Sequence, residues 1–174
     1  FQMTGIPMMP GPTSKDIWGI TWTFMEGQIG GFPVHDEEHL VIKDITKWKE
    51  YVKKPLIPTD DESWAPAIAH ANAINRNEEF VTAMYAPGLF EMTHHMMGME
   101  NSLMAFYEEP EAMHELINYI TEFELEFAEI LIDRIHPDAL FHHDDWGSQI
   151  SSSLSPSMFQ EFFVPAYKKL YGYY

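Results

Sequence analysis

The sequence predicts an α/β protein with a parallel sheet, and three observations support this prediction. Two short segments, 79–85 and 139–143, have the composition of strands, and a long amphipathic helix lies between them at 110–134. A strand, a long helix and a second strand in this order are typical of the βαβ unit of a parallel sheet. The third observation is the loop and further helix that follow the second strand, because they continue the same alternation.

The first half of the chain predicts one strand and two helices. Alternating residues at 20–24 predict a short strand, and the Gly-rich segment 27–33 predicts a turn or loop. Asp44 is a suitable N-cap for a helix that reaches about residue 53, beyond which two prolines end it. A second helix is predicted at 61–75, with an apolar stripe formed by Trp64, Ala67, Ile68, Ala71 and Ile74.

The second half predicts the βαβ unit and its continuation. An Ala-Pro-Gly loop at 86–88 ends the strand 79–85, and two helical segments follow at 89–97 and 100–107. The helix 110–134 has the clearest apolar stripe, formed by Met113, Leu116, Ile117, Ile120, Phe123, Phe127, Ile130 and Leu131. After the strand 139–143, Ser155 is the predicted N-cap of a last helix that bends near Pro165.

Composition excludes several classes of protein. The 27 acidic side chains and 10 basic ones give a formal net charge of −17, which argues against a general nucleic-acid binder and against adsorption to an anionic membrane. The chain contains no cysteine, so a disulfide framework and a thiolate zinc site within it are excluded. No segment approaches the roughly 20 apolar residues of a membrane span, and we expect a cytoplasmic protein.

The strongest candidate site is the run His142, His143, Asp144 and Asp145 at the predicted carboxyl end of the strand 139–143. Active sites of parallel α/β folds gather at this edge of the sheet, and adjacent imidazoles and carboxylates provide acid/base groups or metal ligands. Neighbouring strand residues point to opposite faces, so we expect one His and one Asp in any one pocket. The alternative is a polar loop with capping Asp side chains.

Other candidates precede the long helix. His94 and His95 are adjacent on a predicted helix and point about 100° apart, so we expect one of them in a pocket. Trp18, Trp22 and Tyr85 are candidate pocket walls, with core packing as the alternative. The remaining histidines, among them His35 and His39, are interpreted as structural or surface residues, and the acidic run that includes Glu124 as the solvated face of the long helix.

Several of these motifs resemble the uroporphyrinogen decarboxylase superfamily in order and spacing. They are Tyr-Ala-Pro-Gly at 85–88, Glu-Glu-Pro-Glu-Ala at 108–112, the segment 141–147 with its Asp-Asp-Trp-Gly, Leu-Ser-Pro at 154–156 and Pro-Ala-Tyr-Lys-Lys at 165–169. The resemblance implies a (β/α)8 TIM barrel with its active site at the carboxyl ends of the strands. Because such barrels need about 250 residues, we expect residues 1–174 to be a single domain, an incomplete barrel fragment from the middle of a longer barrel.

The resemblance implies either of two chemistries: decarboxylation of a tetrapyrrole without a cofactor, or methyl transfer between a corrinoid and a small acceptor, usually with zinc. Asp145 stands where the decarboxylases have a small hydroxyl residue, and neither Thr93 nor His94 is the decarboxylases' Tyr. Like charges about 4 Å apart repel by several kcal/mol at an intermediate effective dielectric, so a carboxylate here disfavours a substrate that carries eight carboxylates. These departures favour the corrinoid-linked methyltransferases.

On this interpretation, the expected catalytic residues are Asp144, Asp145, His143 and His94, and the expected substrate-binding residues are Trp18, Trp22, Tyr85, His95, His142 and Trp146. The expected partners are a small molecule or a corrinoid protein, and a homodimer is an open alternative. Zinc, with ligands outside this chain, is the expected cofactor of a methyltransferase, and a decarboxylase needs none. A tetrapyrrole decarboxylase and a non-catalytic ligand-binding barrel remain the alternatives.

Overall fold

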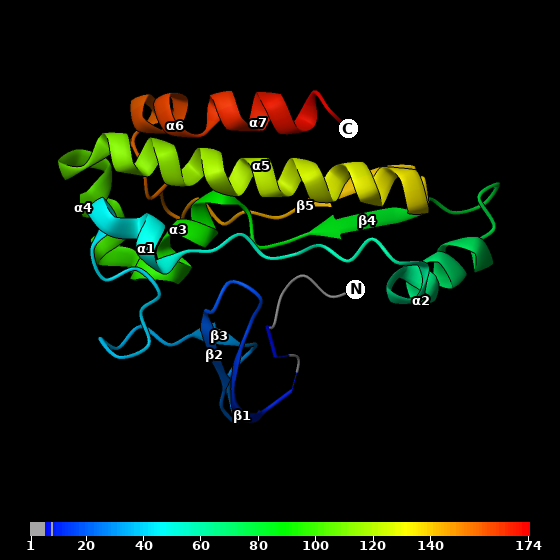
Figure 1. Cartoon of the computed structure of the whole chain (residues 1–174), viewed down its shortest axis with the longest axis horizontal. Coiled ribbons are helices and arrows are strands. Elements are labelled where there is room, and N and C mark those ends of the chain that lie inside the picture. Colours follow the sequence, from blue (N-terminus) through cyan, green and yellow to red (C-terminus); the bar gives the residue numbers. More distant parts are fainter. Residues whose placement is uncertain (1–5, 8) are drawn as a thin grey trace.

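The computed structural model describes residues 6–7 and 9–174 and contains two small sheets among helices (Figure 1). The first sheet is antiparallel and has the order β1-β2-β3, with β1 at Gly11–Lys15, β2 at Thr21–Phe24 and β3 at Phe32–Pro33. Asp16 shapes the turn between β1 and β2, because its carboxylate accepts hydrogen bonds from the Trp18 and Ile20 N–H groups and from Trp22 Nε1. The sequence predicted β2, but not its pairing with two neighbours.

The second sheet confirms the predicted parallel pair. It consists of β4 at Thr82–Tyr85 and β5 at Ala139–His142, paired in parallel from Thr82 opposite Ala139 to Tyr85 opposite His142. Because the pairing is in register, both strands end at the same edge. The segments that follow β4 and β5 therefore leave the sheet side by side.

The helices follow the predicted order with small changes in their ends. The predicted 44–53 helix is a 3-10 turn η1 at Ile45–Lys47 and a short α1 at Trp48–Tyr51, with Asp44 as the N-cap. The others are α2 at Asp61–Ala73, α3 at Leu89–Met97, α4 at Met99–Glu108, α5 at Pro110–Ile135, α6 at Pro156–Phe162 and α7 at Val164–Tyr171. Ser155 caps α6, and the predicted bend near Pro165 is the break between α6 and α7.

Helix α5 forms the centre of the structure, with α6 and α7 lying beside it (Figure 1). Its predicted stripe is buried, except that Ile130 is half-buried. This stripe joins two apolar clusters: a larger one with β2, α3 and α7, and a smaller one with Trp64, Val81 and Tyr85. The interpretation of Glu124 as a solvated residue was wrong, since Glu124 is fully buried on the sheet-facing side of α5.

Arg76 links the segment before β4 to the carboxyl end of α5 by hydrogen bonds. Its guanidinium donates hydrogen bonds to the Ile135 and His136 carbonyls and to Asp138 Oδ2, at 2.9–3.0 Å. Asp138 Oδ2 also accepts the Val81 N–H at 2.9 Å. The fork therefore holds the start of β4 against the start of β5.

We expect Arg76→Lys to lower the free energy of unfolding by about 1 kcal/mol, because an ammonium keeps the charge but cannot reproduce the planar fork. Urea unfolding of both proteins measures the difference. Equal midpoints would show that the charge alone, and not the fork, matters here.

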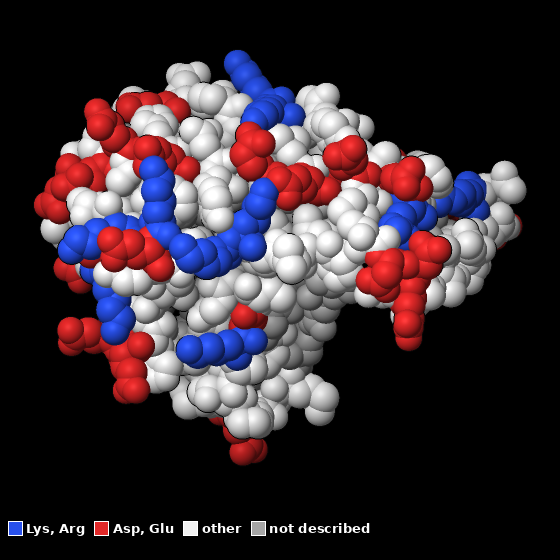
Figure 2. Space-filling view, viewed as in Figure 1, with Lys and Arg blue, Asp and Glu red and all other residues white. Residues whose placement is uncertain are grey.

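Within the described residues, no helix is both long enough and apolar enough to cross a membrane. Figure 2 shows acidic side chains spread over the displayed face, with lysines and arginines between them. Several of these lysines pair with glutamates, as Lys49 does with Glu115 at 2.8 Å.

Candidate functional site

A cavity of about 430 Å³ lies next to the carboxyl ends of β4 and β5. One wall comes from α3, which follows β4, and from the segment that follows β5. The opposite wall comes from β2, β3 and the segment after them. The ionisable lining residues are His35, Glu91, His94, His95 and Asp145, and the apolar ones include Ile6, Trp22, Phe32, Pro33 and Met99.

Asp144 positions α3 at this cavity. Its two carboxylate oxygens accept hydrogen bonds from the Phe90 and Glu91 N–H groups, each at 2.9 Å, and the Tyr167 hydroxyl donates to Oδ2. A carboxylate at this place satisfies N–H groups of the first helical turn that have no partner within the helix. Asp144 therefore joins the exits of β4 and β5, and its side chain is directed at α3 and not at the cavity.

Gly88 makes this close approach feasible. A Cβ atom at Gly88 would lie 2.3 Å from Asp144 Cβ and 2.7 Å from the His143 carbonyl oxygen, well inside contact distance. Only a glycine leaves room for the two strand exits to touch here.

Asp145 lies on the other side of the segment and lines the cavity. The alternation of strand residues thus continues beyond β5, and one Asp of the pair faces the cavity, as the sequence analysis expects. Asp145 is exposed, which leaves its carboxylate available to a ligand.

Three imidazoles line the cavity: His95 is buried, His94 is half-buried and His35 is exposed. Burial lowers the pKa of His94 to about 4 and the pKa of His95 to about 3, and it also lowers the pKa of His35. They are therefore neutral at pH 7, and either donate or accept hydrogen bonds. His95 Nδ1 is buried and has no partner among the described residues.

The expectation that only one of His94 and His95 lies in a pocket was wrong. Both line the same cavity, with ring centroids 4.6 Å apart in an edge-to-face arrangement. His35 is exposed, which agrees with its interpretation as a surface residue, and it also lines the cavity.

Glu91 and His143 form a pair at the edge of the cavity. His143 Nδ1 lies 3.0 Å from Glu91 Oε2, which also accepts the Gly88 N–H at 3.2 Å. Glu91 lines the cavity with a side chain 13% exposed, whereas the His143 side chain is 44% exposed. Burial raises the pKa of Glu91, and its bond to His143 opposes that shift.

Tyr85 and His142 lie on the opposite face of the parallel pair, among α5 and α7, and do not line the cavity. Their rings stack at 5.3 Å, and His142 Nε2 lies 2.6 Å from Glu124 Oε1. Both side chains of the His142 and Glu124 pair are nearly or fully buried. The substrate-binding roles that the sequence analysis assigns to Tyr85 and His142 therefore lack a cavity contact, because their strand positions point to the helices.

The three predicted tryptophans occupy different places. Trp22 lines the cavity and contacts His95 edge to face at 5.1 Å. Trp18 packs on Phe123 in the core and does not line the cavity. Trp146 is part of the surface loop after Asp145, and its Nε1 donates to the Tyr167 hydroxyl at 3.2 Å.

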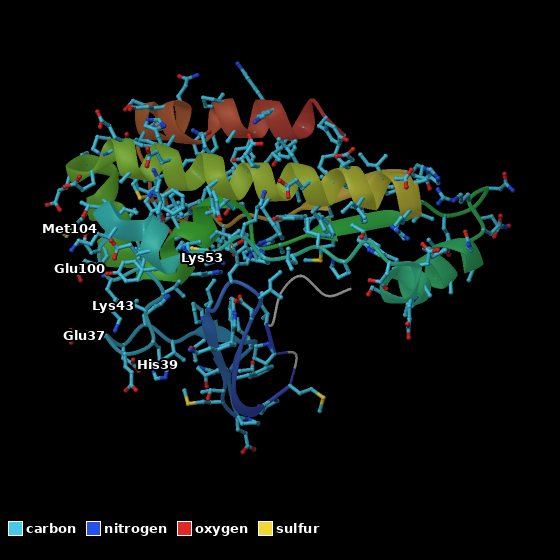
Figure 3. All side chains as sticks on the ribbon, viewed as in Figure 1. Glu37, His39, Lys43, Lys53, Glu100 and Met104 are labelled. Carbon is cyan, nitrogen blue, oxygen red and sulfur yellow. The ribbon has the colours of Figure 1, made fainter. Side chains whose placement is uncertain are left out.

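Sequence reasoning missed Glu91 and His35, and the two omissions differ. Glu91 stands three residues after Gly88 in the first turn of α3, and a glutamate at this position is a known capping signal. This signal identifies a cap, but not a cavity residue. Nothing in the local pattern distinguishes His35 from His39, which lies in the same surface loop (Figure 3) and pairs with Asp36.

The described residues do not form a metal site. Although three imidazoles and two carboxylates line one cavity, no group of three or more His, Asp or Glu side chains in the described part of the chain has the arrangement that holds a metal ion. These residues therefore do not provide a zinc site, and the expectation of zinc ligands elsewhere stays a prediction.

A second cavity, of about 450 Å³, lies between residues 42–46 and α4. Lys43 and Met104, both labelled in Figure 3, belong to its lining. None of the candidate residues lines it. A further hollow in the loop after β5 is lined by two of them, Asp145 and Trp146, and is more open. The cavity at the strand ends is lined by Trp22, His94, His95 and Asp145, and it is therefore the candidate active site.

Comparison with known protein families gave one match. The model of the family described as uroporphyrinogen decarboxylase (URO-D) matches residues 17–173. Searches among curated proteins and among solved structures gave no significant match. The match spans nearly the whole chain, including both strands, α3 and the loop that carries Asp145. The chain therefore belongs to the uroporphyrinogen decarboxylase family.

Proposed function

We propose that this protein is a methyltransferase of its family, which moves a methyl group between a corrinoid and a small acceptor. One observation carries the proposal: among the described residues, the lining of the candidate cavity includes two carboxylates, from Glu91 and Asp145, but no Lys or Arg. Family members are generally enzymes, and the choice between their two chemistries rests on this electrostatic character.

A tetrapyrrole with acetate and propionate arms is a polyanion, and its binding needs cationic partners. Here the three imidazoles that line the cavity are neutral at pH 7, so they add no positive charge. A unit negative charge about 4 Å from a carboxylate is repelled by several kcal/mol at an intermediate dielectric. This lining therefore favours a neutral or weakly acidic acceptor over a polyanion.

The cavity volume also favours a small acceptor. About 430 Å³ falls within the roughly 300–1,000 Å³ of small-molecule pockets. The acceptor would contact the apolar wall formed by Trp22 and Phe32, with its heteroatom toward α3. The corrinoid, which supplies the methyl group, is larger and would approach from outside the cavity.

The chain's own residues would bind the acceptor and handle its proton. Neutral His94 and His95 each present a hydrogen-bonding nitrogen to the heteroatom. Asp145 stands at the strand exit, where its exposed carboxylate would accept a hydrogen bond from the acceptor and orient it for transfer. Asp144 would hold α3 in position and His143 would hold Glu91. Neither of them would contact the acceptor directly.

The wider expectations remain part of this proposal. They are that residues 1–174 form a single domain that belongs to a (β/α)8 barrel, that the protein is cytoplasmic, and that zinc, where it is used, is bound outside this chain. A corrinoid protein is the proposed macromolecular partner, and a homodimer the proposed assembly. We propose no nucleic-acid or membrane partner, given the net charge of −17.

The proposal is tested by giving the full-length protein both substrates. We expect methylcobalamin and a panel of small thiols to yield a methyl thioether, detected by mass spectrometry, and uroporphyrinogen to yield no carbon dioxide. Release of carbon dioxide would identify the decarboxylase instead. Binding of cobalamin without turnover of either substrate would favour the non-catalytic alternative.

A further inference from the structure

We propose that Glu91 is a further catalytic residue of this site: the general base that removes the proton of the acceptor, held in position by His143. The inference rests on the proposed methyl transfer to an acceptor that carries an X–H bond. It is drawn from the pair of side chains at the edge of the cavity.

The two carboxylate oxygens of Glu91 have different hydrogen-bond partners. Oε2 is occupied by the Gly88 N–H and by His143 Nδ1. In the described part of the chain, no residue donates a hydrogen bond to Oε1, and the side chain lines the cavity. One oxygen therefore anchors the carboxylate, and the other remains free to accept a proton from a bound acceptor.

The surroundings make Glu91 a stronger base than an exposed glutamate. Burial raises the pKa of its carboxyl group, so the ionised carboxylate binds a proton more readily. The titratable groups that face it are His143 and Asp144 from the exit of β5, and the other ionisable groups of the cavity are His35, His94, His95 and Asp145. His143 is the only one that bonds to it directly among the described residues.

The proton and electron balance is simple. The acceptor's X–H bond breaks as its proton moves to Glu91 Oε1, and the pair left on X forms the new bond to the methyl carbon. The methyl group leaves its corrinoid carrier without the bonding electron pair, which stays with the carrier. Glu91 then returns its proton to water through the open edge of the cavity, and no further oxidant or reductant is required.

His143 is a positioning residue in this scheme. Its side chain is more exposed than that of Glu91, and its Nδ1 lies 3.0 Å from Glu91 Oε2, where an N–H group would donate to the ionised carboxylate and fix its position. This bond also lowers the pKa of Glu91, so losing it would make the carboxylate harder to ionise.

The test is Glu91→Gln in the full-length protein, with Glu111→Gln as the matched control, because Glu111 is an exposed glutamate in the first turn of α5. Glutamine still accepts the Gly88 N–H, so α3 keeps its cap. With a thiol acceptor and methylcobalamin, we expect kcat to fall about 100-fold or more with little change in KM. The loss should shrink as the pH approaches the ordinary thiol pKa of about 8.5, where the thiolate forms without a base.

A second variant tests the positioning role. His143→Ala should move the acid limb of the kcat/KM profile to higher pH, and His143→Gln, which restores an N–H donor, should move it part of the way back. Full activity and an unchanged pH profile in Glu91→Gln would overturn the proposal while the proposed function stands. An unmodified protein that transfers no methyl group would refute the proposed function, and the role of Glu91 with it.

Discussion

Replacing Asp144 with alanine is expected to lower the free energy of unfolding by about 2–4 kcal/mol. The substitution removes a carboxylate that accepts two N–H groups of α3 and the Tyr167 hydroxyl. Three donors then lose their partner, and the first turn of α3 loses the negative charge that its dipole favours. Because one side chain joins the exits of β4 and β5 to α7, we expect the loss to appear in a single cooperative transition.

The matched control is its neighbour. Asp145 is exposed at the cavity and has no such bonds among the described residues, so Asp145→Ala should leave the urea midpoint nearly unchanged and abolish turnover. Urea unfolding and the methyl-transfer assay, applied to both variants, separate the structural Asp from the functional one. A large destabilisation by Asp145→Ala, or none by Asp144→Ala, would mean that the two roles are assigned the wrong way round.

The parts of the fold that the sequence predicted are those with local signals. The stripe of α5, the caps Asp44 and Ser155 and the loop 86–88 each depend on residues within a few positions of one another. The parallel pairing of β4 and β5 followed from the order of elements alone. A family match over residues 17–173 confirms the family that the sequence motifs suggested.

What sequence reasoning missed depends on contacts between distant residues. The sheet β1-β2-β3 is fixed by Asp16 side-chain bonds and by pairing across loops, not by alternation in β1, all of whose residues are exposed. Glu124 belongs to an acidic run, and only the position of His142 on β5 explains its burial. His35 reaches the cavity because β3 pairs with β2, and no residue near it in the sequence signals that.

Acidification from pH 7.5 to pH 5 is expected to destabilise the protein by about 2–4 kcal/mol, mainly through His94 and His95. Burial lowers their pKa values from 6.5 to about 4 and about 3 in the folded protein. Between pH 6.5 and these values the unfolded chain binds more protons than the folded one, so stability falls as the pH falls. At pH 5, 1.5 units below the unfolded pKa, each histidine costs about 2 kcal/mol.

Other buried groups stabilise the protein as the pH falls. They partly offset the loss caused by the histidines, which is why the expected total extends down to about 2 kcal/mol. Burial raises the pKa values of Glu91, Asp16 and Glu124, so the folded protein binds more protons than the unfolded chain above their ordinary values. Their contribution stabilises the protein as the pH falls toward 5. His35, whose pKa is lowered by burial, adds to the loss.

The double variant His94→Gln, His95→Gln isolates the histidine contribution. Glutamine keeps a donor and an acceptor but does not titrate, so urea unfolding of this variant at several pH values should lose most of the slope between pH 7.5 and pH 5. Only the slope matters, because the substitutions also change the absolute stability. The exposed His70→Gln serves as the control, and its slope should match that of the unmodified protein. An unchanged slope in the double variant would show that the pKa values of these two imidazoles in the folded protein are close to the ordinary 6.5, and hence that burial does not keep them neutral at pH 5.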